Sequence, residues 1–250
     1  MSETTNTDAA TVVLVHGAFA DSSSWNGVVA RLLAEGVTVT APANPLRGVA
    51  ADSEYIAAVL EQIEGPVIAV GHSYGGAVIT NAAAKAKNVV GLVFVAAFAP
   101  DEGESLGEAT AASKDAVLGS VLVPQPYPSG TGELAVEFAI DRAGFHAAFA
   151  ADLPETQTAV MAATQRPISE LAFSERTGDP AWRHLPSWAI IPTPDKAAGT
   201  DVLRSMAERA DARITEVEGS HVIMISQPEL VTKVILEAIA ATDRQTAGAI

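Results

Sequence analysis

The chain of 250 residues contains no cysteine. Disulfides, thiolate metal sites and cysteine nucleophiles are therefore excluded. Basic residues are also scarce, because 15 Lys and Arg stand against 30 Asp and Glu, which gives a formal net charge of −15. Nucleic acids and anionic membranes bind basic surfaces, so the sequence predicts neither kind of partner.

Long hydrophobic runs are missing as well. No stretch approaches the roughly 18 apolar residues that a membrane span requires. The first ten residues, MSETTNTDAA, are polar, so we expect residues 1–10 to be disordered and not to form a secretory signal. A cytoplasmic location is the resulting expectation. The five histidines show no short metal-binding spacing such as HExxH, and we expect no metal site.

Short apolar runs alternate with helical patterns over most of the chain, which is 48% apolar. Apolar strands that alternate with helices indicate a parallel sheet covered on both sides. The expected fold is therefore α/β, a doubly wound, mostly parallel six-stranded sheet with helices on both faces. Strands are expected at 11–16, 37–42, 66–71, 88–98, 187–192 and 213–219, and helices at 24–36, 52–65, 75–86, 201–210 and 228–242. Asp52 or Ser53 is expected to cap the second helix and Asp201 the fourth.

Residues 99–186 interrupt this alternation. The stretch 121–132 is rich in Pro and Gly and cannot be a regular helix, whereas 134–140 and 146–165 have helical patterns. Long excursions between strands are usually functional. We therefore expect a single domain over 11–250, with a helical cap at about 99–186 inserted between the fourth and fifth strands.

The stretch VIAVGHSYGGAV (67–78) contains the pattern G-x-S-x-G at the point where a strand passes into a helix. In this context the pattern is specific, because the sharp turn holds the serine in a strained conformation with its hydroxyl exposed. Only very small residues fit two positions before and after the serine, which accounts for Gly71 and Gly75. The pattern predicts that Ser73 is a nucleophile.

A serine nucleophile needs a base, and the base needs an acid that orients it. His221 follows the sixth strand, and Asp195 is the first carboxylate after the fifth strand. The chain order Ser…Asp…His supports this choice. Asp101 and Glu102, which follow the fourth strand, are the alternative acids. His72 adjoins the serine, but neighbouring side chains on this turn diverge, so a packing or hydrogen-bonding role is expected for it.

The tetrahedral intermediate of acyl transfer needs two N–H donors. The backbone of Tyr74, directly after the nucleophile, is one candidate. Ala18, in the HGAF loop after the first strand, is the second, with Phe19 as its alternate. Ordinary packing explains the cap aromatics as well as ligand binding does. The residues expected to line the substrate pocket are Phe19, Trp25, Tyr74, Phe98, Phe138, Phe145, Phe149 and Val222.

The motifs VLVHGAFADSSSW, VGHSYGGAV and EGSHVIM together resemble the α/β-hydrolase superfamily from Thr11 onward. Within it, the chain resembles the branch of plant methylesterases, hydroxynitrile lyases and small bacterial esterases. The resemblance implies that the insertion is the family's cap over the active site. Lyases of that branch usually carry a threonine, a cysteine and a lysine where this chain has Gly17, Tyr74 and Val222. The missing lysine removes the cation that would stabilise a cyanide leaving group.

The expected function is that of a serine hydrolase that cleaves a carboxylic ester of a small, largely apolar substrate through an acyl-enzyme, without a cofactor. Two alternatives are open at this point: a C–C bond hydrolase or lyase that uses the same triad, and a ligand-binding protein with slow turnover. The small-molecule ester is the expected partner. The oligomeric state is open, with a homodimer among the options.

Overall fold

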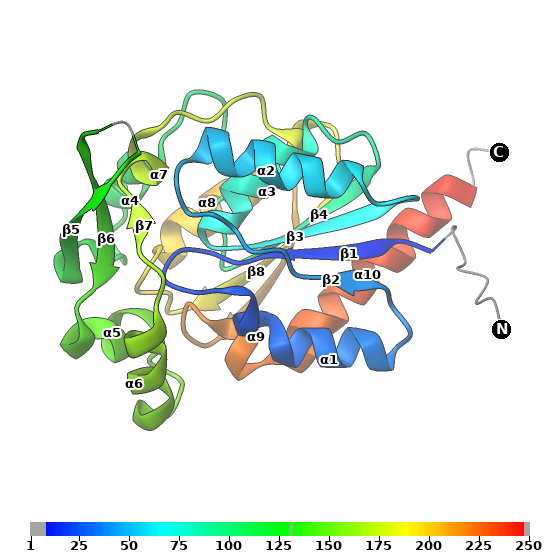
Figure 1. Cartoon of the computed structure of the whole chain (residues 1–250). Coiled ribbons are helices and arrows are strands. Elements are labelled where there is room, and N and C mark those ends of the chain that lie inside the picture. Colours follow the sequence, from blue (N-terminus) through cyan, green and yellow to red (C-terminus); the bar gives the residue numbers. More distant parts are fainter. Residues whose placement is uncertain (1–8, 131, 248–250) are drawn as a thin grey trace, which may run out of the picture.

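A computed structural model of the chain describes residues 9–130 and 132–247. Its centre is a sheet of six parallel strands in the order β2-β1-β3-β4-β8-β9 (Figure 1). The predicted fold class is confirmed. The segment 1–10, expected to be disordered, lies almost entirely outside the described residues. The strands are β1 (Thr11–Val15), β2 (Val39–Thr40), β3 (Val67–His72), β4 (Val89–Val95), β8 (Ser187–Thr193) and β9 (Arg213–Glu218).

The winding direction of the sheet changes between β1 and β3. The chain leaves β1 for β2 on one side and then returns to β3 on the other side of β1. In such sheets, ligands bind outside the carboxyl ends of the strands at this switch point. All six residues of β3 are buried, whereas the edge strand β9 is partly exposed along its length. The apolar character of the central strands therefore reflects helices packed on both of their faces.

Helices cover both faces of the sheet (Figure 1). The helices α1 (Asn26–Ala34) and α10 (Pro228–Ala247) pack together on one face, and α2 (Val49–Glu61) and α3 (Tyr74–Ala83) lie on the other. Helix α8 (Thr200–Arg209) connects β8 to β9. Among the described residues, no helix combines the length and the apolar character needed to cross a bilayer.

Both carboxylates that were expected to cap helices have other roles. Helix α2 begins at Val49, before Asp52. The buried Asp52 carboxylate accepts a hydrogen bond from the Tyr74 hydroxyl at 2.8 Å. Helix α8 begins one residue before Asp201, and that carboxylate accepts hydrogen bonds from Ser113 Oγ and the Lys114 N–H of the insertion. Ser53, the alternative cap of the first of these helices, lies within α2, so both predicted caps are wrong. A carboxylate near a helix start bonds to whichever donors the tertiary fold brings to it.

The insertion between β4 and β8 contains its own small sheet. The strands β5 (Leu122–Pro128), β6 (Leu134–Ile140) and β7 (Ile168–Ser169) pair antiparallel. The predicted helix at 134–140 is thus a strand. Seven apolar-rich residues fit the helical period and the strand period alike, and pairing with β5 selects the strand. β5 carries three prolines, which an edge strand tolerates. The remaining helices are α4 (Leu106–Ala112), α5 (Arg142–Phe149), α6 (Glu155–Thr164), α7 (Leu171–Ser174) and α9 (Ile223–Ser226), with short 3-10 turns η1 (Ser22–Trp25), η2 (Leu118–Val121) and η3 (Ala181–Arg183).

Candidate active site

Ser73 occupies the single residue between β3 and α3, with φ 54° and ψ −123°. A non-glycine residue rarely adopts a positive φ, so this backbone is strained and is held by its surroundings. A Cβ at position 71 would lie 2.6 Å from the Gly75 carbonyl carbon, and a Cβ at position 75 would lie 2.4 Å from the Val15 oxygen. Both glycines are therefore steric requirements of the turn. The N-terminus of α3 below Ser73 favours negative charge at this point.

His221 and Asp195 meet at the same edge of the sheet. They lie on the loops that follow β9 and β8, and His221 Nδ1 is 2.7 Å from Asp195 Oδ2. Asp195 is fully buried, and its Oδ1 accepts the N–H groups of Ala197 and Ala198 at 2.9 Å each. Because these donors hold Oδ1, Oδ2 is left to accept the Nδ1–H of His221. That arrangement leaves Nε2 of His221 as the proton acceptor.

His72 supports the histidine loop from below. Its Nε2 lies 2.9 Å from the backbone oxygen of His221, and the two imidazole rings are 4.8 Å apart. Burial, together with the nearby His221 charge, lowers the pKa of His72 well below its ordinary value. A neutral His72 therefore donates Nε2–H to the His221 carbonyl. The hydrogen-bonding role expected for His72 agrees with this geometry.

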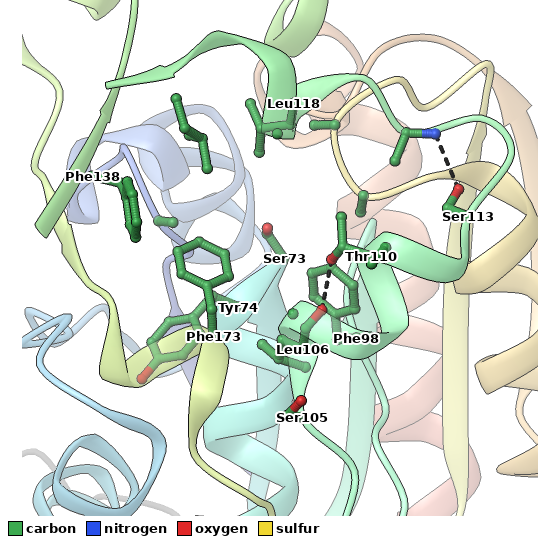
Figure 2. Close-up of a pocket in the computed structure, with 18 of the residues that line it drawn as sticks. Ser73, Tyr74, Phe98, Ser105, Leu106, Thr110, Ser113, Leu118, Phe138 and Phe173 are labelled. Carbon is green, nitrogen blue, oxygen red and sulfur yellow. Dashed lines mark hydrogen bonds between the residues drawn. The ribbon is translucent and has the colours of Figure 1, made fainter. Parts of the chain in front are cut away.

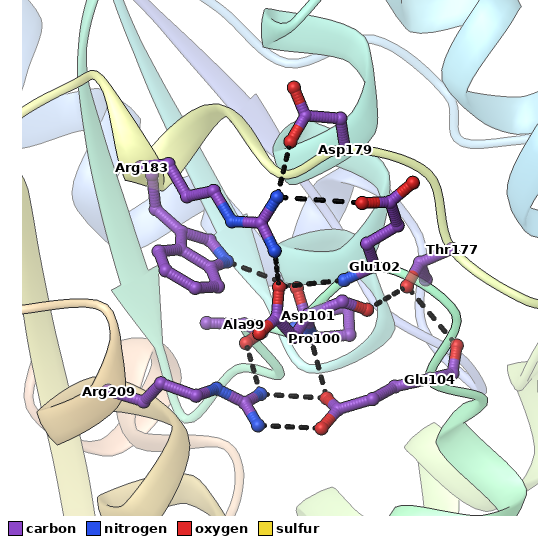
Figure 3. A network of polar contacts seen from close by, with 10 residues as sticks. Ala99, Pro100, Asp101, Glu102, Glu104, Thr177, Asp179, Arg183 and Arg209 are labelled. Atoms are coloured by element: carbon purple, nitrogen blue, oxygen red, sulfur yellow. Dashed lines mark hydrogen bonds and ion pairs between the residues drawn. The ribbon is translucent and has the colours of Figure 1, made fainter.

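The two alternative acids belong to an ion-pair network on another part of the surface (Figure 3). Arg183 lies 2.5 Å from a carboxylate oxygen of Asp101 and 3.6 Å from one of Glu102. The same arginine also pairs with Asp179. Arg183 pairs with both alternative carboxylates, and the His221 imidazole is bonded to Asp195. Neither Asp101 nor Glu102 is therefore placed to orient the histidine.

The loop after β1 lies directly against Ser73. A Cβ at Gly17 would stand 2.6 Å from the Ser73 Cβ, so only glycine permits this approach. His16 fixes the loop, because its Nε2 accepts the Asn44 N–H at 2.9 Å and its Nδ1–H donates to the Gly17 oxygen. Burial lowers the pKa of His16 to about 4, which keeps the ring neutral. Ala18, the next residue of this loop, lines the same cavity as Ser73.

A cavity of about 740 Å³ opens above Ser73. Figure 2 shows Ser73 between the rings of Phe138 and Phe173 on one side and Leu106 and Thr110 of α4 on the other. The cavity is bounded by residues of the core and of the insertion, which therefore covers the serine. Predicted residues that line it are Ala18, Phe19, Ser73, Tyr74, Phe98, Phe138, Phe149 and His221.

Three residues predicted for the pocket lie behind its wall. Trp25 is fully buried and packs edge-on against the His72 ring, with centroids 6.3 Å apart. Phe145 is fully buried on α5 and contacts the ring of Phe149 at 5.1 Å. Val222 is fully buried and follows His221 in the chain. None of the three lines the 740 Å³ cavity. Trp25 and Val222 were expected there from their nearness to motifs, which does not fix the side that a side chain faces, and Phe145 from its place in the cap.

Sequence reasoning did not identify the contribution of α4 and the segment that follows it. Leu106, Leu118 and Phe173 supply much of the apolar wall. The opening carries charge, since both terminal nitrogens of Arg176 bond to Glu108 at 2.8 and 3.1 Å and both side chains are more than half exposed. In the sequence, the insertion after β4 begins with acidic residues. That pattern does not reveal that Glu108 pairs with an arginine 68 residues further along the chain.

The sequence can be placed in a family at this point. A model described as the alpha/beta hydrolase family matches residues 12–234. The chain belongs to this family. The match covers the strands and loops that position Ser73, Asp195 and His221, and it confirms the resemblance seen in the motifs. A search of the curated proteins gives no match.

Solved structures of other α/β-hydrolases share the fold over nearly the whole chain. Polyneuridine aldehyde esterase has a TM-score of 0.77 and 21% identity, covering 92% of this chain and 99% of that one. An extracellular α/β-hydrolase from Paenibacillus species, described as a structural and functional homologue of Tobacco Salicylic Acid Binding Protein 2, has a TM-score of 0.74 and 20% identity, covering 92% and 98%. Tomato Methylketone Synthase I complexed with 2-tridecanone has a TM-score of 0.71 and 21% identity, covering 92% and 97%.

Proposed function

We propose that the protein is a serine esterase that uses Ser73, His221 and Asp195 as its catalytic triad. The observation that carries this proposal is the shared geometry of the three residues. Ser73 stands on a strained turn that lines the cavity, and His221 lines the same cavity with its Nδ1 bonded to a buried carboxylate 2.7 Å away. This is the arrangement that activates a serine hydroxyl.

In the proposed reaction, the Ser73 oxygen attacks the ester carbonyl carbon while His221 Nε2 takes the hydroxyl proton. The N–H groups of Tyr74 and Ala18 bind the oxygen of the tetrahedral intermediate. When the intermediate collapses, the alkoxide leaves and receives the proton from His221. Water then attacks the acyl-enzyme carbonyl while His221 takes a proton from it, and His221 passes this proton to the Ser73 oxygen as the bond between Ser73 and the acyl group breaks and the acid departs. Asp195 stabilises the imidazolium in both steps.

The cavity supports a largely apolar substrate. Aromatic and aliphatic side chains form most of its wall, and its charged lining residues are Glu108 and Arg176, which pair with each other, and the exposed Glu170. A volume of about 740 Å³ is within the usual range for small-molecule sites. The proposed substrate is therefore an uncharged ester with an apolar acyl or alcohol group.

Two residues disfavour a hydroxynitrile lyase. Position 17 has no room for the threonine of those enzymes, because its Cβ would meet Ser73 at 2.6 Å. Val222 stands where a lysine would supply the cation for a cyanide leaving group, and it is fully buried. The site therefore favours water as the second reactant.

A chain-length series of p-nitrophenyl esters, measured on the wild type and on Ser73→Ala, tests the proposal. The wild type should hydrolyse these esters, with a preference that reports the size of the acyl pocket. Ser73→Ala should lose at least about 10³-fold in kcat, since the attacking atom is removed. Full activity in Ser73→Ala would refute the mechanism. Tight ligand binding without turnover by the wild type would favour the binding-protein alternative.

A further inference from the structure

The loop that carries His221 receives side-chain hydrogen bonds at Ser220 and His221 from three parts of the molecule. Asp195 binds the imidazole, and His72 binds the backbone oxygen of His221. The third contact comes from the insertion, where Asp152 binds Ser220, the residue directly before the histidine. The first two contacts belong to the core of the fold, and the third connects the cap to the loop.

The contact between Asp152 and Ser220 uses both oxygens of the carboxylate. One oxygen accepts the Ser220 N–H at 2.9 Å, and the other accepts the Ser220 hydroxyl. Burial raises the pKa of Asp152, but hydrogen bonds, those from Ser220 the largest among them, together hold the pKa below its ordinary value. The carboxylate is therefore ionised at neutral pH. A charged, two-point hydrogen bond fixes the orientation of its partner as well as its position.

On the outer side of the loop, the Phe149 ring packs against the His221 imidazole, with centroids 5.2 Å apart. A second cavity of about 200 Å³ lies there, and Asp152, Ser220 and His221 all line it. A backbone segment that borders a cavity lacks the close contacts that would hold it in a dense interior. The hydrogen bonds from Asp152 are therefore the polar restraint on this face, beside the packing of Phe149.

We infer that Asp152 is a positioning residue for catalysis: the cap, through Asp152 and Ser220, holds the imidazole of His221 in the orientation that accepts the proton of Ser73. The inference rests on the proposed esterase function. Small displacements of a catalytic group are costly, because about 1 Å of misplacement lowers rates by up to about 100-fold. The cap thus acts on the proton-transfer step in addition to enclosing the substrate.

Three variants and a control test this inference with p-nitrophenyl butyrate. Asp152→Ala removes both acceptors, Asp152→Asn keeps one oxygen, and Ser220→Ala removes the hydroxyl only. Asp141→Asn is the matched control, because Asp141 is an exposed carboxylate at the opposite end of α5. We expect Asp152→Ala to lower kcat about tenfold with KM changed less than twofold. Asp152→Asn and Ser220→Ala should lose about threefold, and the control should match the wild type.

The reaction of Ser73 with a fluorophosphonate separates positioning from cap docking. If Asp152 positions His221, the labelling rate falls by the same factor as kcat, and Asp152→Ala with Ser220→Ala is no slower than Asp152→Ala alone. A rise in KM with unchanged kcat and labelling rate would show a merely structural role and overturn the inference. Wild-type kcat in Asp152→Ala would overturn it as well.

Amide hydrogen exchange gives a readout that does not depend on activity. The backbone of residues 219–223 should exchange faster in Asp152→Ala than in the wild type and in Asp141→Asn. Unchanged exchange over this loop would contradict the tether even if the protein proved to be no esterase. Absence of ester hydrolysis by the wild type, with faster loop exchange in Asp152→Ala, would instead refute the proposed function and leave the tether standing.

Discussion

Replacing Asp195 by asparagine should invert the hydrogen bond to His221 without disturbing the fold. Oδ1 of Asp195 accepts two backbone N–H groups at 2.9 Å, from Ala197 and Ala198. An asparagine at this position keeps its oxygen toward those two donors, so its NH₂ group faces His221. The imidazole Nδ1 must then accept a hydrogen bond, which places the ring proton on Nε2.

The expected loss follows from that tautomer. With a proton on Nε2, His221 cannot take the hydroxyl proton of Ser73. The corresponding substitution in serine proteases costs about 10⁴ in kcat with the geometry intact. We therefore expect a loss of about 10⁴ here, equivalent to about 5.4 kcal/mol of activation free energy. Because Asn satisfies the same backbone donors, the thermal midpoint should stay within a few degrees of that of the wild type.

The assay is kcat for p-nitrophenyl butyrate, with Asp101→Asn as a matched control. Asp101 is the alternative acid that pairs with Arg183, so its neutralisation should change kcat less than twofold. Retention of more than a tenth of the wild-type activity by Asp195→Asn would refute the reasoning. A loss of similar size in Asp101→Asn would indicate that the acid lies on the loop after β4 and not on the loop after β8.

Three further predictions concern the turn, the wall and the buried histidine. Gly75→Ala should abolish activity and lower the free energy of unfolding by about 2 kcal/mol in urea titrations, because the new Cβ would lie 2.4 Å from the Val15 oxygen. Phe149 and His221 line both the 740 Å³ and the 200 Å³ cavities, so Phe149→Ala should favour bulkier esters about tenfold in kcat/KM. His16 is neutral when folded, with a pKa of about 4, whereas the unfolded chain protonates it below pH 6.5. The free energy of unfolding should therefore fall by about 3 kcal/mol between pH 6.5 and pH 4 in denaturation curves.

Each of these has a comparison that can contradict it. An active Gly75→Ala of normal stability would show that the turn yields easily. Phe145→Leu changes a ring that lines neither cavity, so it should leave the ester preference unchanged. An equal shift in Phe145→Leu and Phe149→Ala would contradict the inference that Phe149 limits the size of the ester. His16→Gln should flatten the pH dependence between 6.5 and 4. The exposed His184→Gln should not, and equal curves for both variants would contradict the buried, neutral His16.

The residues on the core strands could be predicted from the sequence because local rules agree there. Strand, turn and helix signals coincide around Ser73, and the parallel sheet then brings the loops after β8 and β9 to the same edge. The carboxylate nearest the end of β8 is Asp195, and the structure bonds it to His221. The chain order of the three residues thus favoured, among several carboxylates, the one that lies beside His221.

The cap could not be predicted to the same degree, because tertiary contacts decide it. Residues 134–140 fit a helix and a strand equally, and pairing with β5 makes them a strand. Trp25 and Val222 stand beside motif residues in sequence but face the core. The bonds of Asp152 to Ser220 and of Arg176 to Glu108 each join segments 68 positions apart, a separation at which no local pattern reports a contact.

The central claim, that Ser73 is the nucleophile, is tested most directly by covalent labelling. The protein is treated with a fluorophosphonate, and the adduct is located by mass spectrometry of the intact chain and of its peptides. The account predicts one label per chain, on the peptide that contains Ser73, with hydrolysis of p-nitrophenyl esters lost in parallel and no label in Ser73→Ala. A label on another residue, or ester hydrolysis that continues in the fully labelled protein, would contradict it.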